Sequence, residues 1–86
     1  MKKPALKEEK MKDLLEYMVK SLVDNPENVK IDEIAGEKTI IYELRVGEGD
    51  LGKVIGKEGR MAKAIRTILT AASMKHGKRA QLEIIE

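Results

Sequence analysis

The hydrophobic positions of this 86-residue chain change from helical to alternating spacing and back again along its length. Apolar residues recur at positions 11, 14, 15, 18, 19, 22 and 23, which predicts a helix with one buried face. Asp24-Asn25-Pro26 should end this helix, because proline cannot continue the hydrogen-bond ladder. Residues 1–10 are charged and contain Pro4, so we expect a frayed N-terminal extension followed by one domain over residues 11–86.

Two strands are predicted after this helix. The segment from Thr39 to Val46 alternates strictly and places four apolar residues on one face: Ile40, Tyr42, Leu44 and Val46. The segment from Val29 to Ala35 is weaker, because Ile34 breaks its alternation, and a bulge or strand end near Glu33 would explain the break. Residues 35–38 have the composition of a hairpin turn.

The last third of the chain predicts two helices and a strand. A short helix should begin at Leu51 with Asp50 as its N-cap, and a longer helix should follow Gly59. The longer helix is expected to bury Met61, Ala64, Ile65, Ile68, Leu69 and Ala72 and to expose Ser73. Residues 79–85 alternate as a closing strand. This order predicts an α+β fold in which three helices pack on one face of a three-stranded sheet.

The composition excludes several classes of protein. Because the chain has no cysteine, neither disulfides nor thiolate metal sites are expected, and a reducing compartment fits best. Its apolar runs are only a few residues long, so we predict no membrane span or signal peptide and expect a cytoplasmic protein. With no Trp or Phe and only two Tyr, a platform of aromatic rings for stacking bases is not expected.

Charge is distributed unevenly, although the net charge is only +2. Residues 1–49 hold nine Lys or Arg against eleven Asp or Glu, whereas residues 50–86 hold eight against four. Glu58 is the only acid between Leu51 and Arg79. Such a bias indicates one basic face, as in proteins that bind polyanions, although a solvated lysine-rich helix surface would explain the same counts equally well.

Two of the three overlapping glycine motifs in this basic half are rejected. Residues 47–52 carry the letters of the dinucleotide-binding fingerprint, but only one strand remains, and the expected acidic position falls within the long helix near Arg66. Residues 47–53 also match the first part of a P-loop, but Val54 stands where Ser or Thr would hold magnesium.

The third motif, residues 56–59, lies between the two predicted helices. Its two glycines let the backbone turn sharply and approach a ligand without an intervening Cβ. The following helix presents unpaired N–H groups and the positive end of its dipole, where anions bind. Basic residues lie on both sides of this turn: Lys53, Lys57, Arg60, Lys63 and Arg66. The pattern therefore predicts a phosphate-binding turn.

Residues 54–65, Val-Ile-Gly-Lys-Glu-Gly-Arg-Met-Ala-Lys-Ala-Ile, resemble the signature of KH domains, in which an Ile-Gly-x-x-Gly turn precedes a helix with a core isoleucine. The predicted element order is similar to that of type II KH domains. Size and coverage, roughly residues 11–85, are similar to those of the stand-alone bacterial KH proteins of the KhpA type. The resemblance does not cover the first ten residues.

The resemblance implies binding of single-stranded RNA, with the glycine loop clamping the sugar-phosphate backbone of about four nucleotides. The implied clamp consists of the four loop residues Gly56, Lys57, Glu58 and Gly59. Three flanking basic residues, Lys53, Arg60 and Lys63, would contact phosphates. Two aliphatic residues, Val54 and Ile55, would form the floor of a groove for the bases. An ordinary core role for Val54 and Ile55 is equally open. Glu58 departs from the expected charge, because its carboxylate lowers the local positive potential.

The implied function is that of an RNA chaperone or post-transcriptional regulator. The resemblance also implies a homodimer or a heterodimer with a larger KH protein of the Jag/KhpB type, so a protein-interaction module with weak RNA affinity stays open as the alternative. An enzyme is not expected, since no nucleophile–base pair, carboxylate pair or metal cluster is visible, and no cofactor is expected either.

Overall fold

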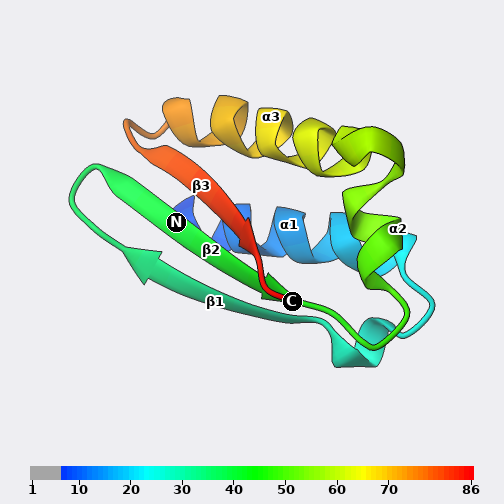
Figure 1. Cartoon of the computed structure of the whole chain (residues 1–86). Helices are drawn as coiled ribbons and strands as arrows, with labels where there is room; N and C mark the ends of the chain where they lie inside the picture. The colour runs from blue at the N-terminus through cyan, green and yellow to red at the C-terminus, as the bar shows by residue number, and fades with distance from the viewer. Residues whose placement is uncertain (1–6) are drawn as a thin grey trace.

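The computed structural model describes residues 7–86 as a mixture of helices and one three-stranded sheet (Figure 1). The elements occur in the order α1 (Lys7–Leu22), β1 (Lys30–Ala35), β2 (Thr39–Arg45), α2 (Leu51–Ile55), α3 (Arg60–Met74) and β3 (Arg79–Ile84). The predicted α+β class and three-stranded sheet are confirmed. No helix in this part of the chain is long and apolar enough to cross a membrane.

The sheet has β2 at its centre, antiparallel to β1 and parallel to β3. A tight turn joins β1 to β2, where the Gly36 N–H donates to the Thr39 carbonyl at 2.7 Å. Parallel neighbours cannot be joined by a hairpin, so the chain must cross over between β2 and β3. The segment that makes this crossover contains α2 and α3, and the predicted glycine turn therefore lies within it.

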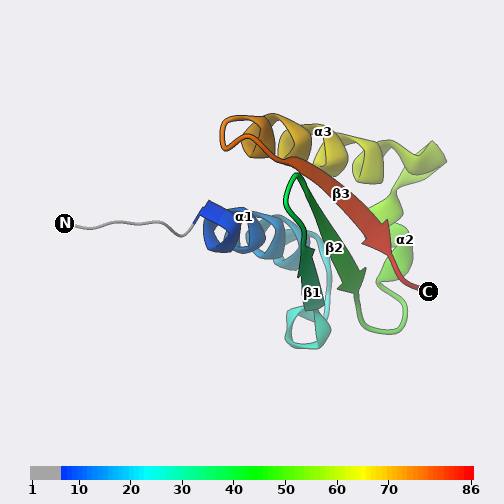
Figure 2. The same cartoon turned by 90° about the vertical axis from the view of Figure 1, so that its left-hand side faces the viewer.

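The core lies between the sheet and the two long helices, which Figure 2 shows on one side of the sheet. The inward face of β2 supplies Ile40, Tyr42 and Leu44, all fully buried as its alternation predicts. Leu15 of α1 and Leu69 of α3 are buried against this cluster. The short helix α2 packs mainly against α1 and α3 rather than on the sheet, which corrects the expectation of three helices on one face.

Two expectations for the first half of the chain are corrected. Helix α1 begins at Lys7, within the segment that was expected to fray, while residues 1–6 lie outside the described residues. The predicted bulge near Glu33 is absent, because β1 pairs with β2 in continuous register through Ala35. Ile34 breaks the apolar alternation because it belongs to the face of the sheet that the helices leave uncovered, where it is 51% exposed.

The buried face of α3 is rotated from the predicted one. Ala64 and Ile68 are exposed, whereas Ala62 and Ser73 are buried. Ser73 is needed inside because its hydroxyl accepts from the Ala80 N–H at 3.1 Å and donates to a carbonyl of its own helix at 3.0 Å. The hydroxyl thus satisfies a backbone donor at the start of β3 that would otherwise be buried without a partner.

Replacing Ser73 with Ala should lower the free energy of unfolding by about 1–3 kcal/mol, because the buried Ala80 N–H loses its acceptor. Chemical denaturation followed by circular dichroism measures this change. The matched control is Ser21→Ala, which removes a hydroxyl whose bond to the Tyr17 carbonyl is exposed and should shift stability by less than about 0.5 kcal/mol. Equal effects of the two variants would contradict the role assigned to Ser73.

Candidate functional site

The glycine turn begins where only glycine fits. Gly56 ends α2 with φ 78° and ψ 172°, and its N–H donates to the Gly52 carbonyl at 2.8 Å. A Cβ at Gly56 would lie 2.7 Å from the Met61 Cβ and 2.8 Å from the Met61 backbone nitrogen. Because Met61 is already within α3, the absence of a side chain at Gly56 is what lets α2 and α3 meet so closely.

Two residues of the glycine turn have a left-handed backbone conformation. Glu58 has φ 57° and Gly59 has φ 73°, and Arg60 then begins α3. Within residues 7–86, Glu58 is the only non-glycine residue with a positive φ, a conformation that costs such a residue about 1–2 kcal/mol. This cost is borne at the tip of the predicted clamp, where the Glu58 side chain is directed to solvent and is 69% exposed.

The basic residues around the turn fall into two groups. Lys57, Lys63 and Arg66 are exposed and form no ion pair with any residue that the structure describes. Lys53 and Arg60 are exposed but paired with the carboxylates of Asp24 and Glu58, respectively. The distances are 3.4 Å from Lys53 Nζ to Asp24 Oδ2 and 3.2 Å from Arg60 Nη2 to Glu58 Oε1.

The two aliphatic residues predicted to floor a groove differ in burial. Val54 has no exposed surface and belongs to the hydrophobic core, so of the two roles left open by the sequence it takes the core role. Ile55 is partly exposed at the end of α2, next to Gly56. Of these two side chains, Ile55 alone has surface that a base could contact.

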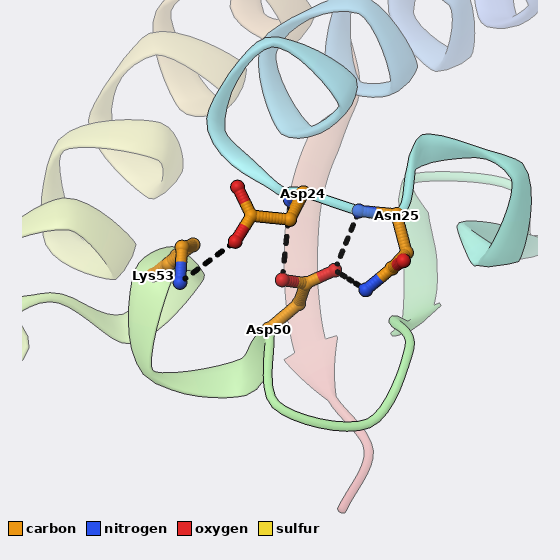
Figure 3. Close-up of polar contacts among 4 residues, drawn as sticks. All are labelled: Asp24, Asn25, Asp50 and Lys53. Carbon is orange, nitrogen blue, oxygen red and sulfur yellow. Dashed lines mark hydrogen bonds and ion pairs between the residues drawn. The ribbon is translucent and has the colours of Figure 1, made fainter.

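Asp50 does not cap α2 as predicted, because its carboxylate points toward the end of α1 (Figure 3). Its Oδ1 accepts from the Asp24 N–H at 3.1 Å, and its Oδ2 accepts from the Asn25 N–H at 2.9 Å and from Asn25 Nδ2 at 3.1 Å. These donors lie in the loop that leaves α1. Asp50 is only 1% exposed, so it is a buried link between the first helix and the glycine-turn region.

The environment of Asp50 favours its charged form despite burial. Desolvation opposes ionisation, but the two backbone N–H groups, the Asn25 amide and the Lys53 ammonium together hold the pKa of Asp50 below its ordinary value. Sequence reasoning missed this link, because Asp24-Asn25-Pro26 was interpreted only as a helix stop. The signal that could have found it is a set of polar side chains at helix ends: Asp24 and Asn25 directly after the first predicted helix, and Asp50 directly before the next one.

Replacing Asp50 with Asn should lower the melting temperature by several degrees at neutral pH, because an amide offers one acceptor oxygen where two are used. A lowered pKa in the folded state adds stability above the ordinary carboxyl pKa, and this contribution disappears as the pH falls through the lowered value.

The gap in melting temperature between parent and Asp50→Asn should therefore be widest above about pH 5 and should narrow as the pH falls below about 4. Thermal denaturation from pH 7 to pH 3 measures it. Asp13→Asn, the same change at an exposed position of α1, should leave the melting temperature nearly unchanged. A gap that stays constant over this range would contradict the buried, ionised Asp50.

The chain matches one family model and several curated relatives. The model, described as the KH domain of KhpA/KhpB, matches residues 12–84. A protein from Aquifex aeolicus is 58% identical over 76 residues, covering 88% of this chain and 96% of that protein. A protein from Clostridium perfringens is 56% identical over 75 residues, covering 87% and 100%, and one from Chlamydia trachomatis is 54% identical over 76 residues, covering 88% and 97%. All three are named RNA-binding protein KhpA.

The match to the family model includes the whole of the glycine turn and the helices on either side of it. Each of the three relatives is matched over nearly its full length, so the similarity extends to the complete domain and is not limited to the glycine motif. On these grounds the chain belongs to the family of KhpA/KhpB KH domains.

Proposed function

We propose that this protein binds single-stranded RNA by gripping the sugar-phosphate backbone with the loop of residues 56–59. The observation that carries the proposal is the exposed, cation-flanked glycine turn between α2 and α3, in a chain whose relatives are named for RNA binding. Lys57 and Lys63 have exposed side chains that no carboxylate of the described residues neutralises. They would make the first phosphate contacts.

The backbone of the turn would supply the second part of the grip. Helix α3 follows the turn directly, so the positive end of its dipole lies at the loop, where the N–H groups of Gly59 and Arg60 donate to the Gly56 and Lys57 carbonyls. The missing Cβ at Gly56 lets the end of α2 pack against Met61, which would hold the start of α3 at the exposed loop where a phosphate binds. Ile55 would offer an aliphatic surface for a base beside the turn, in keeping with the scarcity of aromatic residues.

In the cell we expect this binding to serve post-transcriptional regulation or RNA chaperoning. Contacts to backbone phosphates carry no sequence information, so a clamp of this kind would accept many RNAs. The order of helices and strands, with β3 parallel to β2, supports assignment to the type II KH arrangement. A cytoplasmic location stays a prediction.

A second function, self-association, is favoured by the outward face of α3. Ile68 is 45% exposed and Met74 is 69% exposed, although both are large apolar residues on a helix. A shallow hollow of about 400 Å³ runs along the same helix, lined by Lys63, Arg66, Thr67, Thr70, Ala71 and Met74. The Ile68 and Met74 side chains would give α3 apolar surface for contact with another protein. The partner would be a second copy or a larger KH protein of the Jag/KhpB type.

Replacing Lys57 with Asp should abolish most RNA binding while leaving the fold intact, because Lys57 is exposed at the clamp. Fluorescence anisotropy with a labelled single-stranded RNA pool at two salt concentrations measures affinity. Binding by the parent should weaken steeply with salt, with a log–log slope of about 0.7 per phosphate contacted. The control is Lys30→Asp, the same charge change on β1, which should bind nearly as the parent does. Equal binding by Lys57→Asp would refute the clamp.

Replacing Ile68 with Asp should disrupt self-association, because a charge would have to be buried in the interface. Analytical ultracentrifugation should show the dissociation constant of the dimer raised by about tenfold or more. Ile34→Asp is the matched control, since Ile34 is equally apolar and 51% exposed but lies on the sheet. A parent that sediments as a monomer at all concentrations would remove self-association as a function of this face.

A further inference from the structure

Both paired cations of the clamp are held by carboxylates that lie in or beside it. Lys53 is in α2, before the turn, and its ammonium contacts Asp24 from the end of α1. Arg60 begins α3, after the turn, and its guanidinium contacts Glu58 within the turn itself. The two ion pairs therefore hold the cations that lie on either side of the same loop.

We propose that Asp24 and Glu58 serve as substitutes for RNA phosphates: they hold Lys53 and Arg60 in the free clamp and must be displaced when RNA binds. This inference rests on the proposed function and adds that the two carboxylates determine how tightly the clamp binds. Any anion that contacts these two cations has to displace the carboxylates, which lowers its affinity by the free energy of the two ion pairs.

The strength of the two pairs is suited to exchange. All four side chains are at least 44% exposed, so each pair is weakly stabilising and water-screened. A phosphate with its larger charge and additional acceptor oxygens competes well for the same cation. A pair of this strength opposes RNA binding by roughly two- to fivefold, which is large enough to measure and small enough for RNA to overcome.

Both carboxylates are positioned by backbone that is fixed on other grounds. The Asp24 N–H donates to the buried Asp50 carboxylate at 3.1 Å, which fixes the end of α1 beside α2, where Lys53 lies. Glu58 has a left-handed backbone conformation that glycine would adopt more readily. Its side chain lies on the surface of the turn, where its carboxylate contacts Arg60. The pairs thus follow from the geometry of the clamp.

The proposal is tested with Asp24→Asn, Glu58→Gln and the double variant, using the same labelled RNA pool over a range of salt concentrations. Each single variant should bind about two- to fivefold more tightly than the parent, and the double variant should show roughly the product of both gains. The log–log salt slope should steepen by up to about 0.7 for each cation released from its carboxylate. The matched control is Asp32→Asn, which removes one charge and breaks an equally exposed ion pair with Arg45 on the uncovered face of the sheet. It should leave affinity nearly unchanged. An equal gain from Asp32→Asn would show a net-charge effect and overturn the inference.

The failure of this inference and the failure of the proposed clamp give different results. If Lys57→Asp loses binding while Asp24→Asn and Glu58→Gln bind as the parent does, the clamp stands and the phosphate-substitute role is overturned. If Lys57→Asp binds RNA normally, the clamp itself is wrong.

Discussion

The buried carboxylate of Asp50 is the contact on which the position of the glycine turn depends. It joins two segments 26 residues apart by accepting the N–H groups at which the chain leaves α1. Helix α2 begins at the next residue and is only five residues long, too short to be stable by itself. Its orientation therefore derives from packing against α1 and α3 and from this link. The closeness of Lys53 to Asp24, and the direction in which the turn leaves α2, follow from the same contact.

The strand register places charges of both signs on the uncovered face of the sheet, whereas the charges around the turn and α3 are mostly basic. On the face of the sheet that the helices leave uncovered, pairing places Asp32, Glu43 and Glu83 side by side across β1, β2 and β3. Lys30 and Arg45 form a neighbouring cross-strand pair on the same face, so its charges balance. Lys57 and Lys63, which form no ion pair with a described residue, lie instead at the turn and along α3. A polyanion is thus attracted more strongly to the turn and α3 than to the sheet, so that a small net charge is compatible with oriented binding.

The turn itself combines a steric requirement with a moderate electrostatic one. Gly56 is demanded by the nearness of Met61, whereas Glu58 occupies a left-handed position that a glycine would take more readily. A carboxylate at the tip of a phosphate-binding loop reduces its positive potential. In the proposed clamp, this carboxylate would limit how strongly an RNA backbone is held.

The sequence by itself determined the elements and the motif. Each element buries residues at the period of its own backbone, as Ile40, Tyr42 and Leu44 do in β2, and a glycine turn between two helices is a local feature. What the sequence could not determine were choices between equivalent local patterns. Ile34 could have marked a bulge or an outward side chain, and Ser73 could have faced either way until the Ala80 N–H required an acceptor.

The charged partners depended on the tertiary structure for the same reason. The sequence placed Asp50 at the start of a helix, where capping is the local solution, but only the fold brought the donors of Asp24 and Asn25 to it. Likewise, nothing near Lys53 in the sequence identifies Asp24 as its partner. Local periodicity sets which residues are buried, whereas hydrogen bonds and ion pairs between distant segments exist only once the helices have packed.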